Sequence, residues 1–142
     1  MIGYLDTSAL LKLLIHDEEG SDIVREVIAA TDMHFTSRIS HPEARAALAA
    51  AFRAGRLAGD DHTRSKWDLD RAIASLRIVE LQTGLARAAG DVAERFELRA
   101  YDAVHLASAL VVDGGSTVMV TWDRALASAA AAAGLDVAPG QP

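Results

Sequence analysis

Four acidic residues stand in or just before the first turns of expected helices: Asp6, Glu43, Asp102 and Asp123. Two unit charges about 4 Å apart repel by about 4 kcal/mol at an effective dielectric constant of 20, so clustered carboxylates need protons or a cation to offset them. Oxygen-only ligand sets favour hard cations such as Mg²⁺ or Mn²⁺. Such ions polarise a phosphodiester and lower the pKa of a bound water. If the fold brings the four acids together, they predict metal-assisted phosphodiester hydrolysis.

Each acid taken singly also has a structural explanation. Asp is among the preferred N-cap residues and suits the positive end of the helix dipole, so Asp6, Asp102 and Asp123 could all be helix N-caps. Glu43 follows Ser40 by three residues, which is the spacing of a capping box. Capping and metal binding are therefore both open on local sequence alone.

The segments around the acids alternate between strand-like and helix-like patterns. Strands are expected at residues 1–5, 33–37, 76–81, 116–121 and 135–138. Helices are expected after Asp6 and Asp123 and at about 20–30, 40–54, 60–74, 83–97 and 102–112. Strands that alternate with helices and lack period-2 polarity imply an α/β fold, with a parallel sheet covered on both faces. Since the functional crevice of such a sheet lies beyond the carboxyl ends of its strands, Asp6 and Asp123 are expected at the same edge.

Length and composition limit the class of protein. The chain has 142 residues, so a single domain over residues 1–142 is expected. It has no cysteine, which excludes a disulfide framework and a thiolate zinc site and is compatible with a reducing cytoplasm. The N-terminal segment lacks the features of a signal peptide, and its apolar stretches fall short of the ~20 residues of a membrane span. A soluble, cytoplasmic protein is expected.

The formal net charge of −6 argues against a generic nucleic-acid-binding surface, which is normally basic. It does not exclude an enzyme that bridges its own carboxylates to phosphate through a divalent cation. Of the 14 basic residues, 12 are arginine, the better fork for phosphate. Four of these lie close in sequence to the acids and could form a rim for phosphates: Arg38, Arg45, Arg99 and Arg124.

Two further side chains near the acids each have two interpretations. Lys12 lies within two turns of Asp6, so it would either reach a substrate phosphate or remain a solvated helix lysine. His105 is three residues after Asp102, on the same helix face. It would either transfer a proton or form a hydrogen bond at the edge of the core.

Two other enzyme classes that place an Asp after the first strand are excluded. A phosphatase of the haloacid-dehalogenase type needs a second Asp two residues later, and that position is Ser8. A receiver domain needs a phosphate-accepting Asp at the end of its central strand. The third expected strand of this chain ends instead in Glu80-Leu81-Gln82.

The four acids lie in four blocks, which read YLDTSALLKL at 4–13, SHPEARAAL at 40–48, LRAYDAVHLASA at 98–109 and TWDRAL at 121–126. In order and spacing these blocks resemble the motifs of PIN-domain proteins, especially the VapC-type toxins of bacterial and archaeal toxin–antitoxin pairs. The resemblance spans essentially the whole chain. It implies a parallel five-stranded sheet in the order 3-2-1-4-5, with helices on both faces and the ends of strands one and four side by side.

For function, the resemblance implies an endoribonuclease that depends on Mg²⁺ or Mn²⁺. It also implies a homodimer that is inhibited by a small antitoxin, whose C-terminal segment lies over the pocket. Asp6 and Asp102 would be the principal metal ligands, and Asp123 and Glu43 would complete the acidic set directly or through water.

Small hydroxyl residues match the family's pattern beside these acids, and the resemblance implies that they orient the carboxylates: Thr7, Ser8 and Thr121. The alternative from another class is a PIN-like module that regulates or scaffolds a partner protein without cleaving RNA. Metal-dependent nuclease activity of the purified protein distinguishes the two.

Overall fold

The computed structural model describes residues 1–15 and 18–140, so residues 16–17 and 141–142 of the expected domain lie outside the description. Five parallel strands form one sheet in the order β3-β2-β1-β4-β5. They are β1 (Ile2–Leu5), β2 (Met33–Ser37), β3 (Arg77–Val79), β4 (Thr117–Val120) and β5 (Asp136–Ala138). The predicted fold class and strand order are confirmed. Strands one and four are neighbours, so their carboxyl ends lie side by side.

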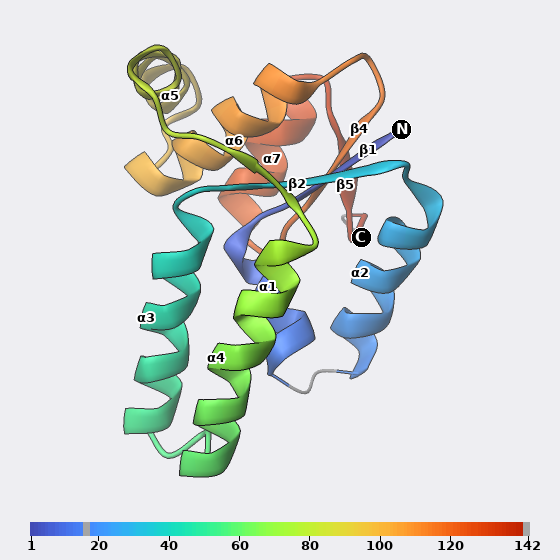
Figure 1. Ribbon diagram of the computed structural model, residues 1–142. Coiled ribbons are helices and arrows are strands. Elements are labelled where there is room, and N and C mark those ends of the chain that lie inside the picture. The colour runs from blue at the N-terminus through green and yellow to red at the C-terminus, as the bar shows by residue number, and fades with distance from the viewer. Residues whose placement is uncertain (16–17, 141–142) are drawn as a thin grey trace.

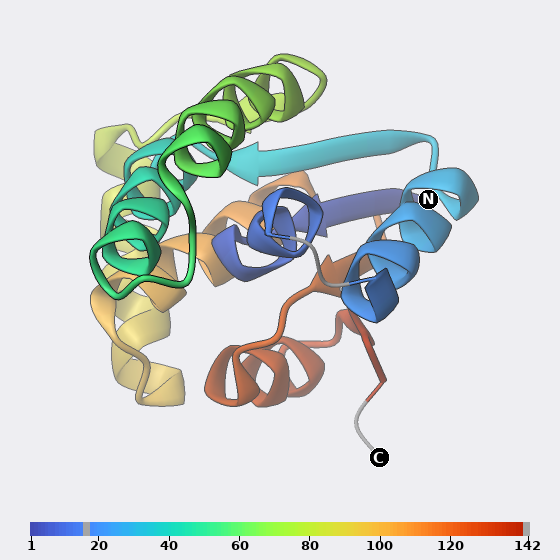
Figure 2. The ribbon, with the colours of Figure 1, turned by 90° about the horizontal axis from the view of Figure 1, so that it is seen from below.

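Helices cover both faces of this sheet (Figure 1). They are α1 (Thr7–Leu14), α2 (Glu18–Ala30), α3 (Ser40–Arg53), α4 (Gly59–Ala74), α5 (Thr83–Phe96), α6 (Ala100–Val112) and α7 (Arg124–Ala132). In Figure 1, α5, α6 and α7 lie above the sheet and α1 to α4 lie below it. Figure 2 shows α3 and α4 side by side, beyond the carboxyl end of β2. The described helices contain none that is both long and apolar enough to cross a membrane.

Successive residues of β1 enter two different core clusters, because neighbouring side chains of a strand point to opposite faces of the sheet. Tyr4 packs on one face with Leu106 of α6 and Leu126 of α7. Leu5 packs on the other face with Leu10 of α1. Both side chains are buried, which explains why this strand reads as a continuous apolar run rather than an alternating one.

Two of the local helix-cap interpretations are wrong. Helix α6 begins at Ala100 with Arg99 as its N-cap, so Asp102 lies within the first turn and does not cap the helix. The N-cap of α3 is Ile39, which makes no side-chain capping bond. The Ser40 hydroxyl instead lies 2.7 Å from the Thr36 hydroxyl in the core, so no capping box forms. Ser40 and Glu43 have the spacing of a capping box, but their side chains form hydrogen bonds with residues of other elements instead.

The third strand is shorter than the predicted 76–81. It pairs only with β2, in a register that runs from Phe35 opposite Arg77 to Ser37 opposite Val79. Since β2 ends at Ser37, the chain beyond Val79 has no partner strand in this register. The predicted strand therefore ran two residues too far, through Glu80 and Leu81.

Candidate active site

Asp6 lies at the carboxyl end of β1 and caps α1, as one of its two interpretations predicted. Its Oδ1 accepts hydrogen bonds from the Ala9 backbone N–H at 2.9 Å and the Ser8 hydroxyl at 2.7 Å. Its Oδ2 accepts one from the Thr121 hydroxyl at 2.6 Å. Burial nevertheless raises the pKa of Asp6 above its ordinary value, because it outweighs these hydrogen bonds. The carboxylate is costly to ionise where it stands and would be stabilised by a nearby cation.

Asp123 follows β4 and caps α7, again as one interpretation predicted. Its Oδ1 accepts a hydrogen bond from the Leu126 backbone N–H at 2.9 Å. Its own backbone N–H donates to the Thr121 hydroxyl at 3.0 Å, and that hydroxyl donates to Asp6. Thr121 therefore joins the ends of β1 and β4. Each Asp uses only one carboxylate oxygen as a helix cap, so capping does not exclude a second role for the other.

Glu43, in the first turn of α3, faces α1 and α6. Its Oε1 accepts hydrogen bonds from the Thr7 hydroxyl at 2.8 Å and from His105 Nε2 at 2.7 Å. Burial opposes ionisation of Glu43. The hydrogen bonds from His105 and Thr7, together with the charges of His105 and Arg99, outweigh burial, so the pKa of Glu43 lies below its ordinary value. Glu43 is thus held as an oriented anion.

His105, which orients Glu43, is itself held in place by a hydrogen bond to Tyr4. His105 is only 2% exposed, and its Nδ1 lies 2.9 Å from the Tyr4 hydroxyl. Because a carboxylate only accepts, Nε2 carries the proton that it donates to Glu43, and Nδ1 faces the Tyr4 hydroxyl on the other side of the ring. The hydrogen-bonded interpretation of His105 is the one that the geometry supports. The sequence offered no sign of the part played by Tyr4, since a tyrosine in an apolar strand is typical of the core.

Asp102 lies beside Asp123 without forming a cap. Arg99 Nε donates to Asp102 Oδ2 at 3.0 Å, and Arg99 Nη2 donates to Asp123 Oδ2 at 3.3 Å. The charged fork of Arg99 therefore spans the two carboxylates. Sequence proximity had marked Arg99 only as part of a possible rim, and its bridging position depends on where α6 begins.

The structure brings all four predicted acids to one edge of the sheet. Thr121 connects Asp6 to Asp123, and Arg99 connects Asp123 to Asp102. Glu43 lies beside them through Thr7, the residue that follows Asp6, whose hydroxyl donates to Glu43 Oε1. Within the described ranges, no group of three or more Asp, Glu or His side chains is arranged, as it stands, to hold a metal ion. The donor chemistry still fits a hard cation, because the four acids offer only oxygen atoms. Arg99 supplies positive charge beside two of the four carboxylates.

The other basic candidates lie less directly on the site. Arg38 is paired with Glu80 in an exposed ion pair, and Lys12 Nζ lies 5.2 Å from the centre of the Trp122 ring. Arg45 is exposed on α3. Arg124 opens α7 directly after Asp123 and lines a small pocket there.

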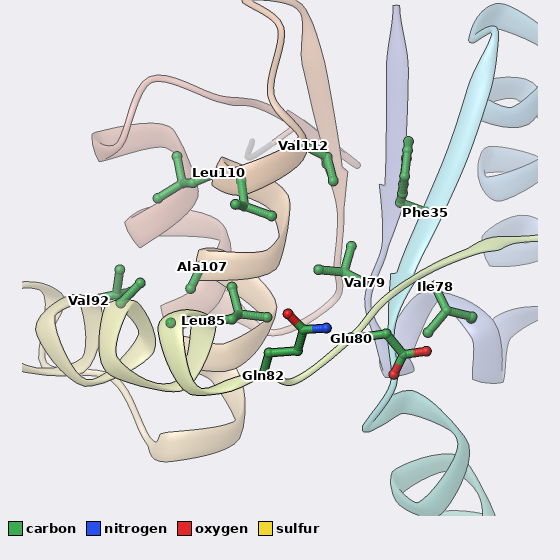
Figure 3. A pocket seen from close by; sticks show the side chains of 13 residues that line it. Phe35, Ile78, Val79, Glu80, Gln82, Leu85, Val92, Ala107, Leu110 and Val112 are labelled. Atoms are coloured by element: carbon green, nitrogen blue, oxygen red, sulfur yellow. The ribbon is translucent and has the colours of Figure 1, made fainter.

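A separate pocket of about 770 Å³ lies between α5, α6 and β3 (Figure 3). Apolar side chains make up most of its wall, among them Phe35, Val79, Leu85, Val92 and Leu110. None of the four acids lines it. The four acids at the carboxyl edge of the sheet are therefore separate from this apolar pocket.

An open parallel sheet with helices on both faces and acids at its carboxyl edge defines the class of this protein. The chain belongs to the PIN domain family, whose model matches residues 3–132. It is 42% identical over 138 residues to Ribonuclease VapC49 of Mycobacterium tuberculosis, which covers 97% of this chain and 95% of that protein. The family resemblance inferred from the four sequence blocks is confirmed.

Solved structures share the fold. PAE2754 of Pyrobaculum aerophilum is similar with a TM-score of 0.67 and 26% identity, over 91% of this chain and 87% of that one. A chain of a toxin–antitoxin complex from Klebsiella pneumoniae has a TM-score of 0.62 and 16% identity, over 85% of this chain and 86% of that one. At the latter identity the likeness supports the fold alone.

Proposed function

We propose that this PIN-domain protein is an endoribonuclease that depends on Mg²⁺ or Mn²⁺ and is the toxin of a toxin–antitoxin pair. The observation that carries the proposal is the convergence of Asp6, Glu43, Asp102 and Asp123 at one edge of the sheet. Sequence similarity supports it, because a protein named as a ribonuclease is 42% identical over nearly the whole chain. We take the PIN domain to cover residues 1–142, and its action to be in the cytoplasm, where cellular RNA is present.

Under this proposal the four acids hold the cation, with Asp6 and Asp102 as principal ligands. A bound divalent ion would polarise the phosphodiester and lower the pKa of an attacking water. The surrounding residues keep the ligands in place. Ser8 and Thr121 donate to the two oxygens of Asp6, so its carboxylate cannot rotate freely. Thr7 and His105 both donate to Oε1 of Glu43, which fixes the direction of that carboxylate.

Removing divalent metal is expected to abolish RNA cleavage, because the acids alone cannot stabilise the charge that develops on the phosphate. Cleavage of a mixed single-stranded RNA would be measured in EDTA and after adding back Mn²⁺. The same addition should raise the melting temperature by mass action on the folded state. Cleavage that continues undiminished in EDTA would rule out the proposed mechanism.

The alternative function, a non-cleaving PIN-like module that regulates or scaffolds a partner, predicts a different result in the same assay. Such a protein would leave RNA intact with Mn²⁺ present, even when purified free of partners. The oriented carboxylates of the buried Asp6 and the partly buried Glu43 favour the enzyme, because a scaffold has no need to hold acids in fixed directions.

A short antitoxin encoded beside this protein is the proposed partner, and a homodimer is the proposed assembly. Support for the antitoxin comes from the four sequence blocks that resemble those of VapC-type toxins and from the 42% identity to Ribonuclease VapC49. The purified protein should sediment as a dimer at micromolar concentration, and the co-expressed antitoxin should suppress its RNA cleavage. A monomer at that concentration, together with no short adjacent gene, would contradict this assignment.

A further inference from the structure

Arg99 is the cationic side chain that contacts Asp102 and Asp123. Its Nε lies 3.0 Å from Asp102 Oδ2, and its Nη2 lies 3.3 Å from Asp123 Oδ2. Its charge also contributes to the lowered pKa of Glu43. One guanidinium thus offsets part of the negative charge of three of the four acids.

Arg99 and Asp102 differ in how much of each side chain is exposed to solvent. The Arg99 side chain is 81% exposed, whereas the Asp102 side chain is only 15% exposed. Ion pairs that involve so exposed a side chain are weak and are screened by salt. Arg99 can therefore leave the carboxylates without disturbing the core, while Asp102 stays where α6 places it.

We propose that Arg99 is a displaceable counter-charge, which neutralises Asp102 and Asp123 in the metal-free protein and contacts an RNA phosphate once a divalent cation binds. This inference rests on the proposed function. The cation and Arg99 compete for the same two oxygen atoms, and two positive charges attract them more strongly than one. The backbone of Arg99 remains at the N-cap of α6, so its released guanidinium stays beside the site. Its planar fork of N–H donors matches the geometry of a phosphate.

The proposal predicts that removing the Arg99 side chain has opposite effects on the two ligands. Metal should bind more tightly, because nothing then competes for the two carboxylates. RNA should bind less tightly in the presence of metal, because a phosphate contact is lost. In the wild-type protein each ligand should strengthen binding of the other, since coupling between two sites is reciprocal.

The first measurement is a calorimetric titration with Mn²⁺. The Arg99→Gln protein is expected to bind Mn²⁺ about three- to tenfold more tightly than wild type, the effect of losing one or two weak ion pairs. Arg71→Gln is the matched control. Arg71 is 80% exposed and also pairs with an Asp three residues away in sequence, but on α4. It removes the same charge and should leave Mn²⁺ affinity unchanged.

The second measurement is binding of a short labelled single-stranded RNA with phosphorothioate linkages, with and without Mn²⁺. Mn²⁺ should tighten RNA binding to wild type and to Arg71→Gln. It should have a clearly smaller effect on Arg99→Gln. Loss of one phosphate contact should also reduce the slope of log K against log salt by about 0.7 for a single strand.

The Mn²⁺ and RNA binding measurements distinguish failure of the Arg99 proposal from failure of the proposed function. If wild type and Arg99→Gln bind Mn²⁺ with equal affinity, the inference about Arg99 is overturned, but the proposed metal site is retained. Tightening in Arg71→Gln as large as in Arg99→Gln would also overturn it, because the cause would then be net charge. RNA binding that is the same in Arg99→Gln and wild type would overturn the phosphate contact. Wild-type protein that binds no Mn²⁺ would overturn the proposed function and the inference together.

Discussion

Replacing Asp6 with asparagine is expected to reduce RNA cleavage by more than about 100-fold, beyond the 10–100-fold typical of residues that only support a metal ligand. An amide lacks the anionic charge that a divalent ion needs from its ligands. The fold should persist, because Asn caps a helix about as well as Asp and can still accept from the Ala9 N–H and the Ser8 hydroxyl. Cleavage rate with Mn²⁺ and melting temperature without metal would be measured on the same preparation.

The melting temperature of Asp6→Asn should equal or exceed that of wild type. Burial raises the pKa of Asp6, so the ionised carboxylate is unfavourable in the folded protein near neutral pH, and a neutral amide removes that cost. Asp22→Asn is a suitable control, since Asp22 is an exposed acid on α2 that pairs with Arg25. It should change neither quantity. Wild-type cleavage and a wild-type response to Mn²⁺ in Asp6→Asn would mean that Asp6 is only a helix cap.

Alanine at Asp102 is expected to reduce cleavage by about 100-fold or more, and alanine at Asp123 by at least about 10- to 100-fold, but the two variants should differ in stability. Asp123 caps α7 through the Leu126 N–H, so Asp123→Ala should also lose about 1 kcal/mol of folding free energy. Asp102 accepts no helix-capping bond, because Arg99 occupies the N-cap position of α6. Asp102→Ala should therefore keep a melting temperature close to that of wild type.

Chemical denaturation and the cleavage assay together test this difference. Equal midpoints for the two alanine variants would contradict the assignment of caps, and full cleavage by either would contradict its place among the metal ligands. The amide variants provide the comparison. Asp123→Asn should recover the stability lost in Asp123→Ala but not the cleavage, because only the cap tolerates a neutral oxygen.

Local sequence was sufficient for the parts of the fold that depend on neighbouring residues. Apolar runs and their stops predicted β1 and β4 and the helices that follow them, because periodicity and N-cap preference act over a few residues. Parallel strands that end in Asp6 and Thr121-Trp122-Asp123 then predicted that two acids share one edge of the sheet. The strand order itself came from the family resemblance. No local pattern specifies which strands lie next to each other.

Tertiary structure alone decided how the four acids are used. Ser40 and Glu43 have the spacing of a capping box, yet their side chains bond to Thr36 in one case and to Thr7 and His105 in the other. Arg99 reaches Asp123 across 24 positions of sequence, and Tyr4 reaches His105 across 101. Such contacts depend on strand order, on the residue at which α6 begins and on the packing of α3 against α1. A window of neighbouring residues contains none of this information, because each distance is set by elements that are far apart in the chain.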